Sequence, residues 1–111
     1  MSETCLNKND VKEILKEFRE KIRSIIKGKF IELILFGSYA RGDYEFGSDI
    51  DVLVVVKERL TGTERKRISK ILSDISLAYD TVIACFDYPY TEFETRNSPF
   101  LLNVRREGIK I

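Results

Sequence analysis

The sequence predicts a small α/β (α+β) domain, in which a mixed β-sheet has helices packed mainly on one face. Apolar residues recur at helical spacing over residues 10–27 and 61–79. Two short apolar runs between them, 30–36 and 50–56, have the length and the Ile, Leu and Val content of strands. Helices and strands are mixed along 111 residues, which is enough for one domain, 1–111, with one core.

The first two elements are a helix over 10–27 and a strand over 30–36. Asp10 with Glu13 fits an N-terminal capping box, and Gly28 is suited to end the helix. The glycine-containing loop that follows leads into the strand over 50–56. That strand is apolar on both faces, which is typical of a strand covered on both sides.

The second half begins with a helix over 61–79, where Thr61 and Glu64 resemble a capping box. A third strand is expected over 80–86, with Pro89 ending it.

The last elements are short. A helical turn is expected over 91–96, and Ser98 and Pro99 have the residue types of an N-cap and first helical residue. The helix that they open is expected to end at Gly108, before a short strand over 109–111.

Composition and charge exclude several functions. Nineteen Lys and Arg oppose eighteen Asp and Glu, so the net charge of +1 gives no basis for general nucleic-acid binding. The sequence has no His, which excludes imidazole as a base or metal ligand. Cys5 and Cys85 lie far apart and predict neither a zinc site nor a disulfide framework.

The polar N-terminus lacks the pattern of a signal peptide, and the apolar run over 52–56 is too short to cross a bilayer. We therefore expect a cytoplasmic protein without membrane contact.

The segment over 35–56 carries the chemistry. Gly37 and Ser38 follow a strand, where a glycine lets the backbone approach a phosphate and a hydroxyl donates another hydrogen bond. Arg41 could clamp phosphate oxygens with its guanidinium. Gly37-Ser38 alone also fits an ordinary tight turn, and Arg41 a solvated loop residue.

Asp49 and Asp51 are the second ingredient. Side chains alternate along a strand, so both carboxylates face the same way while Ile50 points into the core. Such a pair suits magnesium, which binds through a few carboxylates together with substrate phosphates. Alone, the pair also fits two acidic residues at the surface end of a strand.

Taken together, Gly37-Ser38, Arg41-Gly42 and Ser48-Asp49-Ile50-Asp51 resemble the signature of the DNA polymerase beta-type nucleotidyltransferase superfamily. The short length resembles its minimal nucleotidyltransferase branch, which includes antitoxin partners of HEPN-domain toxins. The resemblance implies the nucleotidyltransferase fold. It also implies a phosphate site at Gly37, Ser38 and Arg41, metal binding by Asp49 and Asp51, and Ser48 bracing the carboxylates.

The same family has a third acidic residue on a later strand. Asp80, which opens the strand expected over 80–86, is the candidate ligand, and Asp87 at the far end of that strand is the second choice. Asp80 could instead be a turn residue at the end of the preceding helix.

The resemblance implies a reaction as well. ATP or another nucleoside triphosphate would bind with two Mg²⁺ ions held by Asp49, Asp51 and Asp80, and a hydroxyl would attack the α-phosphorus. In the HEPN-associated branch this hydroxyl belongs to a tyrosine of the toxin. The competing class is an antitoxin that acts mainly as a non-catalytic binding module for a HEPN-type partner.

The intact carboxylate pair favours an enzyme, and the short chain favours an acceptor supplied by a small helical HEPN-type protein. A homo-oligomer stays open. The large apolar residues near the C-terminus fit either a partner surface or a cover for the core; they are Tyr88, Tyr90, Phe93, Phe100, Leu101 and Leu102.

Overall fold

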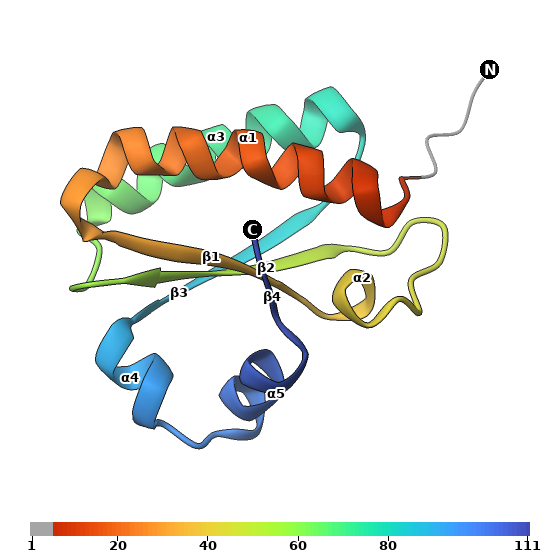
Figure 1. Cartoon of the computed structure of the whole chain (residues 1–111). Coiled ribbons are helices and arrows are strands. Elements are labelled where there is room, and N and C mark those ends of the chain that lie inside the picture. Colours follow the sequence, from red (N-terminus) through yellow and green to blue (C-terminus); the bar gives the residue numbers. More distant parts are fainter. Residues whose placement is uncertain (1–5) are drawn as a thin grey trace.

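The computed structural model describes residues 6–111, so Cys5 lies outside the described residues. Four strands form one sheet with helices on both of its faces (Figure 1). In chain order, the elements are α1 (Lys8–Ile26), the 3₁₀ turn η1 (Lys27–Lys29), β1 (Phe30–Phe36), α2 (Ser38–Arg41), β2 (Ile50–Val56), α3 (Gly62–Tyr79), β3 (Ile83–Pro89), α4 (Tyr90–Thr95), α5 (Pro99–Glu107) and β4 (Ile109–Lys110).

The sheet has the order β3-β2-β1-β4 and is mixed, as the sequence predicts. β1 runs antiparallel to both β2 and β4, whereas β2 and β3 are parallel and are joined through α3. A parallel pair needs such a crossover, because the chain must return to the same end of the sheet. β2 lies inside the sheet and is covered on both faces, which accounts for its nearly continuous apolar sequence.

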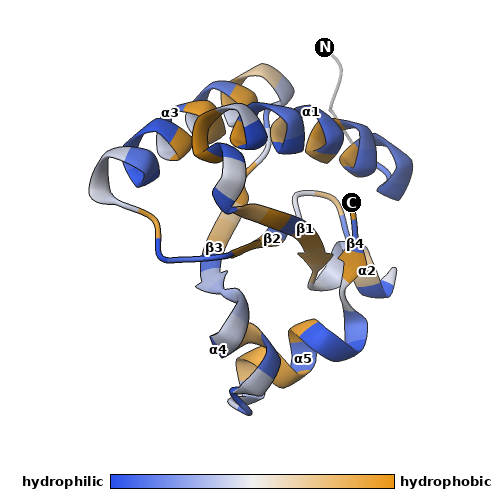
Figure 2. Ribbon diagram, turned by 60° about the vertical axis from the view of Figure 1, so that its left-hand side comes forward, coloured by the Kyte–Doolittle hydropathy of each residue, from blue (hydrophilic) through white to orange (hydrophobic). Residues whose placement is uncertain are grey.

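The two long helices, α1 and α3, pack side by side on one face, as expected (Figures 1 and 2). Their stripes bury Phe18, Ile22 and Ile75 against the Ile50 side of β2. The short helices α4 and α5 cover the opposite face, where Phe93 and Leu101 form a second core cluster. This second layer positions the C-terminal end of α5 near the end of β1.

The helix starts were predicted well for the later helices and less well for α1. Thr61 and Glu64 do form the capping box of α3. The box predicted for Asp10 and Glu13 is wrong: α1 begins at Lys8, because Asn7 accepts the Asp10 N–H and Asp10 accepts the Asn7 N–H.

The third strand lies further along the chain than predicted. β3 extends through Pro89, which is tolerated because β3 is an edge strand and needs no hydrogen-bond donor on its outer side. Asp80 does not open the strand but is the C-cap of α3, with φ 52° and ψ 53°. At α5, Ser98 and Pro99 are the N-cap and first helical residue, as predicted.

Over residues 6–111, no helix combines the length and apolar character needed to cross a membrane.

Candidate active site

The turn after β1 contains Gly37 and Ser38, the first two residues predicted for the site. Gly37 has φ +79°, and its carbonyl accepts the N–H groups of Ala40 and Arg41 in the single turn of α2. The Gly37 N–H donates to the Glu107 carboxylate at 2.8 Å. The turn is therefore fixed from two sides, by its own helical hydrogen bonds and by the end of α5.

Gly37 also lies directly against Asp51. A Cβ atom at this glycine would be 2.3 Å from Asp51 Oδ2, closer than any real contact, so a side chain at position 37 would displace the carboxylate. The pairing of Phe36 with Asp51 between β1 and β2 brings the two residues together. The turn and the Asp51 carboxylate, which the sequence predicts to act together, are thus direct neighbours.

Asp51 is partly buried near the start of β2, and exposed Asp49 precedes it in the chain. Burial raises the pKa of Asp51, and the neighbouring charge of Asp49 raises this pKa further. The Arg41 charge lowers the pKa of Asp51, and Glu107 raises it. Two carboxylates that repel one another at the rim of a sheet form a place where a cation is stabilised.

The carboxylate pair suits a Mg²⁺ ion that takes its other ligands from substrate phosphates and water. Among residues 6–111, no three or more His, Cys, Asp or Glu side chains are grouped so that they could hold a metal ion by themselves. Mg²⁺ is commonly bound by one or two carboxylates, with substrate phosphates and water completing its octahedron. Asp49 and Asp51 therefore suit an ion that arrives with a triphosphate, not a metal enclosed by protein ligands alone.

Arg41 is exposed and makes two ion pairs. Its guanidinium lies 3.2 Å from Asp43 and 3.2 Å from Glu107. The hydrogen bond to Asp43 is the largest cause of the raised pKa of Arg41, and the bond to Glu107 is the next. Arg41 is thus oriented along the rim of the site, where it also acts on the charge of Asp51.

The two predicted serines differ in their surroundings. Ser38 is the first residue of α2, directly after the turn. The Ser48 hydroxyl accepts the Glu45 N–H at 2.8 Å, and so closes the turn that leads into Asp49. Ser48 thereby supports the loop that leads into Asp49.

The structure does not place the two candidates for the third carboxylate beside Asp51. Asp80 lines a small pocket of about 120 Å³ with Gly47 and Ser48, and it is not among the charges that shift the pKa of Asp51. Asp87 pairs with Arg65 of α3 at 3.0 Å.

The register of the sheet explains the position of Asp87. Asp51 is level with Ala84 in the parallel pair of β2 and β3. Asp87 lies three residues beyond Ala84, and so it projects from the opposite face of the sheet. On β3, the position level with Asp51 is held by an alanine.

Glu107 is the acidic group near Asp51 that sequence reasoning missed. It lies 70 residues from Gly37, at the end of a helix whose sequence shows only helical spacing and a capping signal. No local pattern marks such a residue, because its role depends on how α5 packs against β1.

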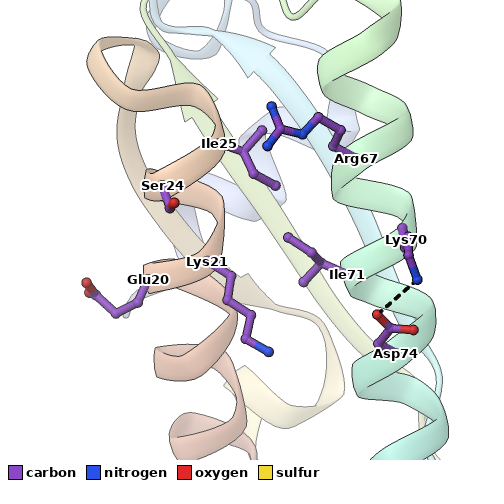
Figure 3. A pocket seen from close by; sticks show the side chains of 8 residues that line it. All are labelled: Glu20, Lys21, Ser24, Ile25, Arg67, Lys70, Ile71 and Asp74. Atoms are coloured by element: carbon purple, nitrogen blue, oxygen red, sulfur yellow. Dashed lines mark hydrogen bonds and ion pairs between the residues drawn. The ribbon is translucent and has the colours of Figure 1, made fainter.

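A larger hollow lies elsewhere. It measures about 490 Å³ and lies between α1 and α3, with Ile25 and Ile71 facing one another between the helices (Figure 3). Its rim carries charges of both signs, including the Lys70–Asp74 ion pair. Neither Asp49 nor Asp51 lines this groove, which therefore does not belong to the site described above.

Comparison with known proteins agrees with this arrangement. The family described as "Nucleotidyltransferase domain" matches residues 11–107. A protein of Methanocaldococcus jannaschii named "Putative protein adenylyltransferase" is 43% identical over 102 residues, which are 92% of this chain and 99% of that protein.

Two solved structures share the fold. One is a toxin–antitoxin crystal structure with AMP-PNP, with TM-score 0.59 and 22% identity over 95% of this chain and 72% of that chain. The other is a tri-AMPylated HEPN toxin of Shewanella oneidensis in complex with an MNT antitoxin. Its TM-score is 0.55, with 21% identity over 89% of this chain and 69% of that chain. At these identities the likeness concerns the fold alone.

Proposed function

The chain belongs to the nucleotidyltransferase domain family, and from this premise we propose that it transfers AMP from ATP to a hydroxyl group in a magnesium-dependent reaction. The observation that carries the proposal is the contact between Gly37 and Asp51, because it joins a phosphate-binding turn to a carboxylate pair. A purely structural turn has no need of two acidic groups held together beside it.

In this proposal the residues act mainly by positioning. Gly37, Ser38 and Arg41 receive the terminal phosphates, while Asp49 and Asp51 face the reacting centre. Mg²⁺ bound at the carboxylates would neutralise the triphosphate and lower the pKa of the acceptor hydroxyl. The acceptor oxygen forms a bond to the α-phosphorus, the bond to the bridging oxygen breaks, pyrophosphate leaves, and the hydroxyl proton passes to solvent.

Asp80 remains our candidate for a third carboxylate, although it caps α3. Its place beside Ser48 keeps it near the loop that carries Asp49.

The acceptor we propose is a tyrosine of a small helical HEPN-type protein. The M. jannaschii relative is named as a protein adenylyltransferase, and a structure with the same fold contains an AMPylated HEPN toxin. We also propose a cytoplasmic location, where ATP and such a partner are both present.

A second function, binding without catalysis, is favoured by one observation. Tyr90 and Leu102 are 47% and 40% exposed on the α4 and α5 side of the sheet, while Phe93 and Leu101 from the same segment are buried. The C-terminal segment therefore covers the core and also leaves apolar groups that a partner could contact.

The test combines the purified chain with MgCl₂, ATP labelled at the α-phosphate and a purified HEPN-type protein. We expect label on the partner, and its loss with Asp49→Ala plus Asp51→Ala or with EDTA. Asp74→Ala, an exposed residue of α3, is the matched control and should retain transfer. Transfer that survives the double substitution contradicts the proposal, whereas partner binding without any transfer by the wild-type chain supports the second function.

A further inference from the structure

We propose that Glu107 is a positioning residue of this active site, whose carboxylate holds the Gly37 turn and the Arg41 guanidinium in the geometry that receives the triphosphate. The identity of the ligand rests on the proposed function. The role of Glu107 rests on contacts that α5 makes with the end of β1.

One carboxylate joins two parts of the phosphate site. Glu107 Oε2 accepts the Gly37 N–H at 2.8 Å and lies 3.2 Å from Arg41 Nη1. The other oxygen, Oε1, is 3.4 Å from the same guanidinium nitrogen. A backbone donor and a cationic side chain are therefore tied to a single anchor. Hydrogen bonds to a charged group are stronger than neutral ones.

The Glu107 carboxylate accepts a backbone N–H group, that of Gly37, for which the sheet offers no acceptor. Gly37 is buried, and a buried N–H without a partner is costly. β4 pairs with β1 only at Ile34 and Leu35, so the strand partner ends before Gly37. The side chain of Glu107, two residues ahead of β4, supplies the acceptor that the sheet does not.

Packing holds Glu107 in this place. Leu101 and Val104 of α5 are buried against the sheet. Gly108, the residue after Glu107, packs closely against α5 and β1. A Cβ atom at this position would lie 2.4 Å from the Val104 carbonyl oxygen and 2.5 Å from Ile34 Cγ2. The end of α5 is thus pressed onto β1, and the Glu107 side chain is only 20% exposed.

Glu107 could instead act as a latch that ATP displaces. Displacement would leave a mostly buried carboxylate without its two partners, the Gly37 N–H and the Arg41 guanidinium. Leaving such a charge unpaired is unfavourable. The contacts therefore favour a carboxylate that stays in place when the nucleotide binds.

The test measures ATP affinity by calorimetry in the presence of MgCl₂ and, independently, hydrogen exchange at the Gly37 amide. Loss of a residue that orients the ligand-binding groups without contacting the ligand typically lowers affinity or activity by about 10–100-fold. We expect a loss of that order, and faster Gly37 exchange, in Glu107→Ala. Glu107→Asp, whose carboxylate is withdrawn by one methylene, should behave in the same way. Glu107→Gln keeps an acceptor oxygen and should restore most of the affinity.

Glu94→Ala is the matched control, because Glu94 is an exposed acid of α4 on the same side of the sheet. Unchanged or tighter ATP binding by both Glu107→Ala and Glu107→Asp overturns the proposal, as does unchanged Gly37 exchange. The two proposals fail differently. A wild-type chain that binds no ATP contradicts the proposed function, and a wild-type chain that binds ATP no better than Glu107→Ala contradicts only the role of Glu107.

Discussion

Replacing Gly37 with alanine should both strain the backbone of the turn and displace the Asp51 carboxylate. The residue has φ +79° and ψ −157°, a region that residues with a side chain occupy at a cost of about 1–3 kcal/mol. The new Cβ would also lie 2.3 Å from Asp51 Oδ2, so the carboxylate must move. Displacement of a catalytic group by about 1 Å can reduce the rate on the order of 100-fold.

The matched control is Gly47→Ala. Gly47 has φ +84°, and nothing lies within 4 Å of the position that its Cβ would take. This variant should pay a backbone cost of about 1–2 kcal/mol without moving Asp51. In a small domain, 1 kcal/mol corresponds to a fall in Tm of about 4–8 °C.

Thermal denaturation followed by circular dichroism gives the stability of each variant. AMP transfer, measured well below both melting temperatures, gives the activity. We expect both variants to lose stability and only Gly37→Ala to lose transfer. A folded Gly37→Ala protein with wild-type transfer, or equal loss of transfer in Gly47→Ala, would refute the reasoning.

Three other predictions concern single groups. Because the pKa of Asp51 is raised on folding, its charge opposes folding as pH rises through the folded-state pKa. Asp51→Asn should therefore raise the Tm at pH 7 but not at pH 3. A rise in Tm of the same size at both pH values would contradict this. Asp80 caps α3 with positive φ, so Asp80→Gly should be neutral or stabilising in urea unfolding, and loss of AMP transfer by this stable variant would identify Asp80 as a functional carboxylate. Burial raises the pKa of Cys85 to about 12, so in a Cys5→Ser background the thiol should react with a disulfide reagent at pH 8 far more slowly in the native than in the unfolded protein. Equal reaction rates of the native and unfolded proteins would contradict this.

The central part of the site was predictable because it is local in sequence. Gly37-Ser38 directly follows β1 and Asp49-Ile50-Asp51 lies at the start of β2, and strand alternation assigns Ile50 to the core. The α3 capping box was also predictable, because its donors and acceptors lie three residues apart. Such features depend on spacing that the backbone imposes on any chain.

Other features depended on competition between neighbours. Asn7, and not Asp10, caps α1, although both residue types are suitable. The sequence before β3 offered Asp80 as a strand residue or as a helix end, and the helix end prevailed. Propensity does not decide between adjacent candidates of similar strength.

The sequence by itself determined the fold class, the long helices and the positions of the Gly37-Ser38 turn and the Asp49-Asp51 pair, next to the ends of two successive strands. Only the tertiary structure decided that Gly37 touches Asp51, that Asp87 faces away from Asp51 and that Glu107 anchors Gly37 and Arg41. The physical reason is the distance along the sequence between the residues that interact. Helical and strand periodicities are set within a few residues, whereas the contact of Glu107 with Gly37 exists only because α5 packs on the sheet and brings together residues 70 positions apart.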